Sequence, residues 1–214
     1  MDKIELGNTG IKVSRLGLGT VKFGRNQGVK YPSNFELPNE QFLHKFLKLA
    51  KSLGINLIDT APAYGSSEKR LGRLLEGQRK DWVIVGKVGE EFDNGKSKYI
   101  FTQDHFKYSL ERSLKRLKTD FIDILLIHSD GNDLNILNDY KIIKTMHEFK
   151  DQGLVKAIGA STKTPEGGIK CLETMDLVMA TYNPSYTKEK PVLDFAYKNH
   201  KGVLLKKLLS SGHN

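Results

Sequence analysis

Short hydrophobic runs alternate with longer amphipathic segments along this chain, with little deviation from about residue 40 onward. Runs rich in Ile, Leu and Val that are buried on both faces are typical of parallel strands covered by helices. The runs predicted as strands cover residues 13–19, 56–60, 83–88, 121–128, 155–160, 176–182 and 202–209. The pattern therefore predicts an α/β fold with about seven parallel strands.

The amphipathic segments between these runs carry start and stop signals for helices. We expect Asn39 to cap the first helix, whose hydrophobic stripe ends before Gly54 in the C′ position. The next helix is expected to start at Ser66 or Ser67 and to end near Gly77. Further helices are predicted over residues 102–117, 137–152, 164–175 and 190–199.

The first residues, KIELGNTGIKV, have a different pattern. Ile4 and Leu6 alternate with polar residues before a Gly, Asn and Gly turn, and Ile11 and Val13 alternate after it, as in a β-hairpin. We expect this hairpin to cap part of the fold. No linker-like change of composition follows it, so residues 1–214 are predicted to form one domain.

Alternating strands and helices fit either a doubly wound open sheet or a closed (β/α)8 barrel of the TIM type. Polar residues favour the barrel, because they stand where four predicted strands end: Asp59, Lys87, His128 and Ser161. In such barrels the chemistry gathers at the carboxyl ends of the strands.

Composition and charge narrow the kinds of partner and the cellular compartment expected for this chain. The net charge of +9 favours anionic partners, which include phosphorylated cofactors and nucleic acids, but the charges are scattered over predicted helices as on an ordinary solvated surface. Cys171 is the single cysteine, so an internal disulfide is excluded and a reducing compartment, the cytoplasm, is expected. We expect no membrane span, because no hydrophobic run approaches the ~20 residues that crossing requires.

Four residues together make a chemically sensible proton donor. Asp59 and Tyr64 lie in the segment IDTAPAYG, Lys87 in WVIVGKVG, and His128 ends FIDILLIH. Each alone has an ordinary structural explanation. Together, a charged Lys87 held by Asp59 would lower the pKa of Tyr64, and His128 would donate a hydrogen bond to a carbonyl oxygen. This chemistry requires no metal.

With these four residues in this order, the chain resembles the aldo-keto reductases. The likeness spans nearly the whole sequence and includes the N-terminal hairpin, the segment RLGLGTVKFG, the Asp-Thr-Ala-x-x-Tyr-Gly motif followed by SSEKRLGRLL, and the strand-end Lys and His. The resemblance implies a (β/α)8 barrel that reduces aldehydes or ketones with NADPH, less often NADH.

The resemblance also implies roles for single residues. Tyr64 would be the general acid, Lys87 would modulate its pKa, Asp59 would be the charge partner of Lys87, and His128 would orient the substrate.

On the cofactor side the resemblance implies contacts from several segments. Gly19, Thr20 and Asp59 would lie near the nicotinamide ribose, and Ser161 would bind the carboxamide. Backbone N–H groups at Leu209 and Ser211 would reach the pyrophosphate.

The chain departs from the family pattern in places. Thr162, Met179 and Lys206 stand where many members have Asn, Gln and Tyr. The sequence ends just after the seventh strand, so the eighth strand, its helix and the basic loop for the adenosine 2′-phosphate are missing from it. Seven strands leave two open edges, through which we expect self-association.

Two further classes of function compete with carbonyl reduction. The chain could serve as a non-catalytic scaffold or interaction module that lacks a full cofactor site. It could also be a Schiff-base aldolase that uses Lys87 or Lys206 as the nucleophile. Nucleic-acid binding would rest on charge alone and is not expected. The identity of the small carbonyl substrate is not encoded in any motif.

Overall fold

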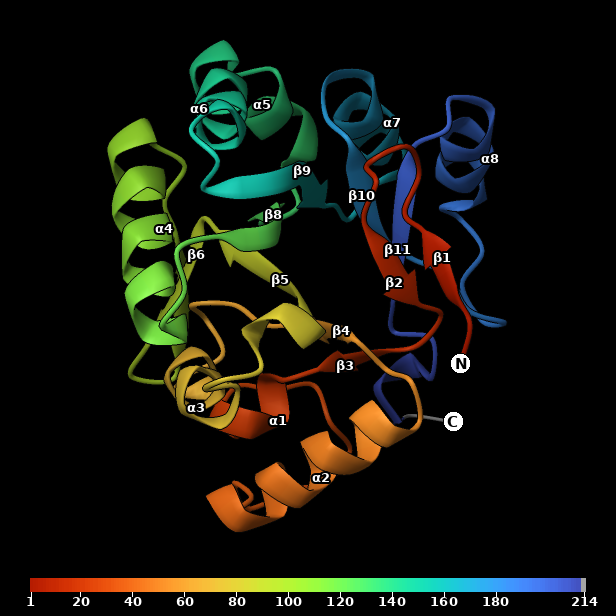
Figure 1. The fold of residues 1–214 in the computed structure, drawn as a ribbon. Helices are drawn as coiled ribbons and strands as arrows, with labels where there is room; N and C mark the ends of the chain where they lie inside the picture. Colours follow the sequence, from red (N-terminus) through yellow and green to blue (C-terminus); the bar gives the residue numbers. More distant parts are fainter. Residues whose placement is uncertain (213–214) are drawn as a thin grey trace.

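Seven strands pair in parallel to form one curled sheet in the computed structural model, which describes residues 1–212 (Figure 1). Their order in the sheet follows their order along the chain, and β3 and β11 lie at its two edges within the described residues. The strands are β3 (Gly17–Gly19), β4 (Leu57–Asp59), β5 (Val83–Val88), β8 (Ile122–His128), β9 (Val155–Ser161), β10 (Leu177–Thr181) and β11 (Gly202–Lys206). The sheet is an incomplete (β/α)8 barrel, which confirms the predicted fold class.

Helices cover the outer face of the sheet (Figure 1). Three of them begin at the expected type of cap, because the side chains of Asn39, Thr102 and Thr164 each accept a backbone N–H bond from the first turn. The helices are α1 (Val21–Gly24), α2 (Glu40–Ser52), α3 (Ser67–Leu74), α4 (Gln103–Leu117), α5 (Asp133–Leu137), α6 (Tyr140–Asp151), α7 (Pro165–Thr174) and α8 (Lys190–Lys198), with 3-10 turns η1 (Arg79–Asp81) and η2 (Ser210–Gly212).

The hydrophobic core has two layers, one on each face of the sheet. The outer layer packs helix residues such as Leu43, Phe106 and Leu172 against strand residues such as Ile84. The inner layer fills the interior of the barrel with residues from the other face of the strands, among them Val85. Alternation along each strand therefore supplies both layers, which explains why the strands are hydrophobic throughout.

The N-terminal hairpin is present and covers one end of the barrel interior. Strands β1 (Lys3–Glu5) and β2 (Lys12–Ser14) pair antiparallel, with Ile4 opposite Val13. Leu6, Ile11 and Val13 are buried in the same cluster as the inward residues of the barrel strands. The side chains of one hairpin face therefore close this end of the interior, and Figure 1 shows the path of the hairpin.

The run predicted as one strand over residues 13–19 is two strands, β2 and β3. Between them the chain turns at Arg15 and Leu16, because Ser14 donates its hydroxyl to the Leu16 carbonyl (2.6 Å). The Ser14 backbone N–H also donates to Oδ1 of Asn56 (2.7 Å), which ties the turn to the start of β4. The single-strand prediction was wrong because these side-chain bonds redirect the chain from the hairpin into the sheet.

A second hairpin was not predicted from the sequence. It consists of β6 (Glu90–Asp93) and β7 (Lys96–Tyr99), joined by a turn in which Asn94 and Gly95 have φ values of 48° and 77°. Asn-Gly between two short strands is a strong hairpin signal, and it could have been recognised.

Two predicted elements have different ends. The helix predicted over 137–152 starts at Tyr140, because Asp139 caps it, and Leu137 belongs to the short helix α5. The strand predicted to reach residue 209 ends at Lys206, because Lys207 adopts a left-handed conformation (φ 58°).

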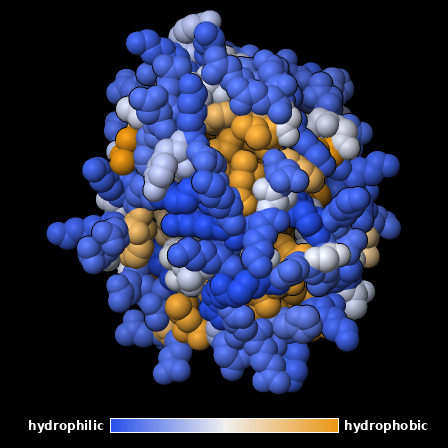
Figure 2. All heavy atoms as spheres, turned by 60° about the vertical axis from the view of Figure 1, so that its left-hand side comes forward, coloured by the Kyte–Doolittle hydropathy of each residue, from blue (hydrophilic) through white to orange (hydrophobic). Residues whose placement is uncertain are grey.

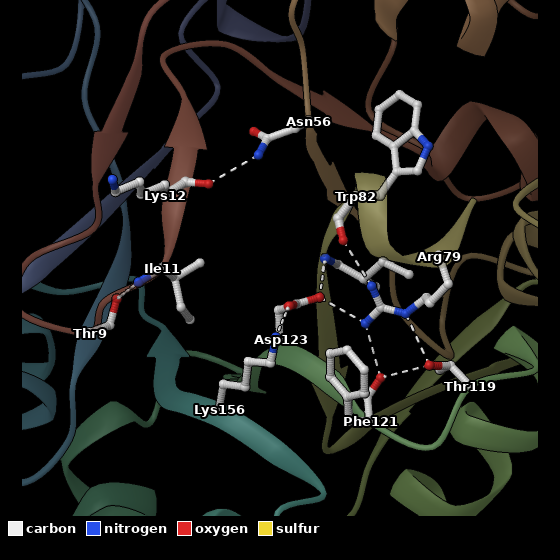
Figure 3. Close-up of polar contacts among 11 residues, drawn as sticks. Thr9, Ile11, Lys12, Asn56, Arg79, Trp82, Thr119, Phe121, Asp123 and Lys156 are labelled. Atoms are coloured by element: carbon white, nitrogen blue, oxygen red, sulfur yellow. Dashed lines mark hydrogen bonds and ion pairs between the residues drawn. The ribbon is translucent and has the colours of Figure 1, made fainter. Parts of the chain in front are cut away.

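A buried polar network ties strands together at the end of the sheet where the strands begin (Figure 3). The Asp123 carboxylate accepts bonds from Arg79 (2.7 Å), from the Ile84 backbone N–H (3.0 Å) and from Lys156 (3.2 Å). The cations of Arg79 and Lys156 also lie over the Phe121 ring, 4.4 and 4.3 Å from its centroid. The starts of β5, β8 and β9 are thereby fixed to one another.

Hydrophilic side chains cover most of the face drawn in Figure 2, and hydrophobic residues show only in separated patches. The longest described helix, α4, has 15 residues, whereas a membrane span needs ~20. None of the helices within residues 1–212 has the length and apolar character to cross a membrane.

We predict that Asp123→Ala lowers the free energy of unfolding by about 3 kcal/mol, because it removes a buried acceptor and leaves Arg79 and a backbone N–H without it. Urea denaturation followed by circular dichroism measures the change. Glu111→Ala is the matched control, because Glu111 pairs with Lys115 on the exposed face of α4 and should change the midpoint little. Equal small effects of the two variants would contradict the structural role of the network.

Candidate active site

Ionisable side chains gather where the parallel strands end. Asp59, His128 and Lys206 are the last residues of β4, β8 and β11, and Lys87 is next to last in β5. Because parallel strands end on the same side of a sheet, these four side chains face one mouth of the barrel.

Lys87 and Asp59 form the central ion pair of this mouth. The Lys87 side chain is only 1% exposed, and its ammonium donates to Oδ1 of Asp59 and to the Thr60 carbonyl (3.0 Å). The Asp59 side chain keeps 22% of its surface exposed. A lysine at this depth requires such partners, since an unpaired buried charge is strongly unfavourable.

Tyr64 lies against this pair. Its hydroxyl is 3.4 Å from Oδ2 of Asp59, and the Lys87 ammonium is 5.0 Å from the centroid of its ring. The ring of His128 approaches Tyr64 edge-on, with centroids 6.4 Å apart. The structure therefore brings together the phenol, ammonium, carboxylate and imidazole that the sequence singled out.

Close backbone packing fixes the loop that carries Tyr64. Gly24, at the end of α1, touches this loop so closely that a Cβ would overlap the Tyr64 carbonyl and the Ser67 backbone nitrogen. Gly65 has φ 59° and meets the Gly24 carbonyl in the same way. Arg25 adds a bond from its guanidinium to the Ala63 carbonyl (3.1 Å). Only glycine fits at these two contact points. The close backbone contacts there hold the loop and so set the position of the Tyr64 phenol.

The pKa of Tyr64 shifts opposite to the direction expected from the sequence. Burial raises the pKa of the phenol well above 10, and the charges of Asp59 and Glu90 raise it further. Lys87 was expected to lower this pKa, but burial and the carboxylates of Asp59 and Glu90 set the direction of the shift. Tyr64 consequently holds its proton through the neutral and alkaline range.

Glu90, the first residue of β6, is a site residue that sequence reasoning missed. Its Oε2 lies 2.8 Å from Nδ1 of His128, and its Oε1 accepts a bond from the Ser97 hydroxyl (2.6 Å). Although burial opposes ionisation, His128, Ser97 and Arg25 lower the pKa of Glu90 to about 2. The Asn-Gly signal predicts a hairpin that starts directly after β5. Recognising it would have placed Glu90 close to the mouth of the barrel.

Glu90 determines which nitrogen of His128 carries a proton. Burial lowers the pKa of His128 below 6.5, more than the charge of Glu90 raises it, and Lys87 and Lys206 lower it further. At neutral pH the imidazole is therefore neutral, and its one proton belongs on Nδ1, facing the Glu90 carboxylate. Nε2 is then an acceptor, whereas the sequence analysis expected His128 to donate.

Arg25 completes this side of the mouth. Its guanidinium stacks 3.4 Å from the centroid of Phe92 in β6 and lies 4.0 Å from Oε1 of Glu90. It thereby links the second hairpin to the loop that carries Tyr64, and no motif in the sequence pointed to it.

The residues predicted near the nicotinamide differ in accessibility. Gly19 is exposed at the end of β3, with open space where a Cβ would stand. Thr20 is fully buried, and its hydroxyl donates to the Asp59 carbonyl (2.8 Å), so its side chain presents no surface to a ligand in this structure. Ser161, at the end of β9, accepts a bond from Lys206 (2.8 Å).

Leu209 and Ser211 lie beyond β11, at the 3-10 turn η2. Ser210 and Ser211 both have left-handed backbone conformations, with φ values of 48° and 59°. Within residues 1–212, no hydrogen bond, ion pair or ring contact joins Leu209 or Ser211 to the cluster of Asp59, Tyr64, Lys87 and His128.

Comparison with known proteins gives a consistent result. The model of the Aldo/keto reductase family matches residues 15–212. A crystal structure from Pseudomonas aeruginosa assigned to the aldo-keto reductases, PA4992, is 54% identical with a TM-score of 0.89, over 96% of this chain and 77% of that one. The holo form of the aldo-keto reductase AKR11C1 from Bacillus halodurans is 25% identical with a TM-score of 0.83, over 99% of this chain and 68% of that one.

Curated relatives are longer than this chain and less similar to it than the Pseudomonas aeruginosa structure is. The aldo-keto reductase YhdN of Bacillus subtilis is 30% identical over 96% of this chain and 61% of its own length. The NADH-specific methylglyoxal reductase of Escherichia coli is 28% identical over 93% of this chain and 62% of its own length. Among curated relatives the chain spans between 36% and 62% of the relative's own length.

We predict unequal costs for breaking the central ion pair from its two sides. Asp59→Asn should lower the free energy of unfolding by about 3 kcal/mol, because it leaves Lys87 fully buried without a counter-charge. Lys87→Met should cost less, roughly 1–2 kcal/mol, because Asp59 keeps access to water. Chemical denaturation of both variants and of the double variant measures the coupling. A larger cost for Lys87→Met would contradict the burial argument.

Proposed function

Since the chain belongs to the aldo/keto reductase family, we propose that it reduces the carbonyl group of an aldehyde or ketone with a nicotinamide cofactor. The observation that carries this proposal is the contact of Tyr64 with the Lys87–Asp59 pair, beside His128, at the mouth of the barrel. A phenol that keeps its proton in a partly enclosed, polar site is suited to protonate an oxygen on which negative charge develops.

The residues at the mouth fit a nicotinamide cofactor. The space above Gly19 is open, and the buried hydroxyl of Thr162 has no hydrogen-bond partner among the described residues. We propose that Gly19 and Ser161 hold the nicotinamide end, with Asp59 beside it and Thr20 acting through the Asp59 carbonyl. Leu209 and Ser211 would supply backbone N–H groups for the pyrophosphate. When bound, the cofactor supplies the hydride.

In the proposed reaction Tyr64 donates its proton to the carbonyl oxygen. The Lys87 ammonium, over the face of the phenol ring, stabilises the tyrosinate that remains after the proton leaves. Asp59 holds Lys87 in place through their ion pair. Tyr64 is therefore a proton donor that stays protonated until negative charge develops on the substrate oxygen.

His128 has a pH-dependent part in this proposal. In its neutral form Nε2 accepts a hydrogen bond, which suits an alcohol hydroxyl. Below the pKa of His128 both ring nitrogens carry protons. Because Nδ1 faces Glu90, Nε2 is the nitrogen that can donate to a carbonyl oxygen. Reduction of a carbonyl would therefore be favoured as the pH falls through this pKa.

The finer parts of the proposal concern cofactor, location and partners. We propose NADPH, with NADH as the alternative, because Lys163 and Lys207 add positive charge near the end of β11 and would attract a further phosphate. The Escherichia coli relative is an NADH-specific methylglyoxal reductase. Comparing the dissociation constants of NADPH and NADH for this chain distinguishes the two cofactors. We also propose that residues 1–214 are one domain, that the protein works in the cytoplasm without nucleic acid, and that edges β3 and β11 allow self-association.

We predict that Tyr64→Phe reduces the rate of cofactor oxidation with a small aldehyde at least a hundredfold, because it removes the proton donor. Cofactor affinity, followed by fluorescence titration, should stay unchanged. Tyr108→Phe is the matched control, since Tyr108 lies exposed on α4. A wild-type protein that binds the cofactor but never oxidises it would replace this proposal with that of a non-catalytic binding module.

We predict that Glu90→Gln removes the pH dependence contributed by His128. The amide oxygen should stay with Ser97 and Arg25, so the amide N–H faces Nδ1 and moves the imidazole proton to Nε2. His128 then donates while neutral, so kcat/KM for reduction should vary little with pH, whereas in the wild type it should rise as the pH falls below about 6.5, through the lowered pKa of His128.

Imidazole nitrogen NMR shifts report the same tautomer change without turnover. Glu91→Gln is the control, because Glu91 pairs with Arg112 and His105 rather than His128. Identical pH profiles and shifts for wild type and Glu90→Gln would refute the assignment.

A further inference from the structure

Lys206 is an ionisable group at the mouth of the barrel that the proposed reduction does not use. It is the last residue of β11, and its side chain is only partly exposed. Its nitrogen donates to the Ser161 hydroxyl oxygen (2.8 Å) and to the Thr162 carbonyl (2.7 Å), both at the end of β9. The side chain thus crosses the open end of the barrel over the intervening strand β10.

The two acceptors match the neutral form of the amine. A neutral lysine amine has two N–H groups and one lone pair, whereas an ammonium has three N–H groups. With its two hydrogens bonded to Ser161 and Thr162, a neutral Lys206 keeps its lone pair available to a reacting carbon. Its position is fixed at the same time, so little motion has to be lost before an attack.

The surrounding charges also favour the neutral amine. Burial lowers the pKa of Lys206 to about 8, and the nearby cations Lys207, Lys87 and Lys163 contribute, while Glu189 opposes them. Desolvation and neighbouring positive charge are the two ways in which lysines become nucleophilic near neutral pH. Lys87 offers no such site, because its ammonium is fully buried and bonded to Asp59.

We propose that Lys206 is a reactive amine that forms a reversible imine with small aldehydes or ketones at the mouth of the barrel. The lone pair of Nζ attacks the carbonyl carbon and forms a C–N bond. The two amine hydrogens then leave with the carbonyl oxygen as water, and a C=N bond replaces the C=O bond. The step needs no oxidant or reductant, and it goes beyond the proposed reduction.

The experiment is reductive trapping of the imine. The full chain is incubated with propanal below the concentration of total lysine, in the presence of sodium cyanoborohydride, over a pH series. Peptide mapping by mass spectrometry then locates the secondary amine. Among the lysines we expect the first adduct on Lys206, with a trapping rate that rises around pH 8, whereas exposed lysines react appreciably only toward pH ~10.

Variants separate this reactivity from mere exposure. Lys206→Arg keeps the positive charge and should abolish the early adduct, while Lys207→Arg, the neighbouring and more exposed lysine, should retain it. Ser161→Ala removes one acceptor and should slow trapping several-fold while circular dichroism stays unchanged. An adduct pattern that follows exposure, with Lys206 unlabelled or labelled last, would overturn the proposal.

A further variant keeps the proposal distinct from carbonyl reduction. Tyr64→Phe should trap propanal at Lys206 as fast as the wild type does, because the imine needs no phenol. Loss of trapping with reduction intact would overturn the reactive amine alone, and loss of reduction with trapping intact would overturn the reductase proposal alone.

Discussion

The buried ion pair of Lys87 and Asp59 is the constraint on which the rest of the mouth depends. An ammonium that is 1% exposed is stable only beside a carboxylate, so β5 and β4 have to end at matching heights. The Asp59 backbone carbonyl in turn accepts both the N–H and the hydroxyl of Thr20, which brings the end of β3 to the same level. One charge pair therefore sets the relative positions of three neighbouring strands and offers its second carboxylate oxygen to Tyr64.

The contacts at the two ends of the barrel have different roles. Those at the mouth position the site residues, and those at the opposite end stabilise the sheet. At the mouth, the close contact of Gly24 with Gly65 and the bond from Arg25 to the Ala63 carbonyl fix the loop of Tyr64. At the opposite end, the Asp123 network and the N-terminal hairpin hold the starts of the strands together and close the interior (Figure 3). Because the contacts that position the site and those that hold the strand starts lie at opposite ends of the strands, changes in the loops at the mouth can alter chemistry without loosening the sheet.

Hydrophobic periodicity was enough to predict the seven strands, most of the helices and the hairpin cap, since each depends on local pattern and burial. It could not reveal the break at Ser14, because that break depends on a bond to Asn56, which is 42 residues away. Asp59, Tyr64, Lys87 and His128 were found because each stands at or just after a strand end. Glu90 was missed because its hairpin was missed. The directions of the pKa shifts depend on several charges at once, and no spacing rule gives their balance.

Burial raises the pKa of Tyr64 and lowers the pKa of Lys206. In both cases it favours the neutral form of the side chain. For the phenol this means a retained proton, and the nearby carboxylates of Asp59 and Glu90 strengthen the effect. For the amine it means a lost proton, and the cations Lys207, Lys87 and Lys163 strengthen that effect. Carboxylates thus help Tyr64 to keep its proton although Lys87 lies over its ring, and cations help Lys206 to lose its proton although Glu189 opposes them. A single desolvated mouth can in this way keep an acid and a nucleophile ready at the same pH, because burial disfavours the charged form of both groups.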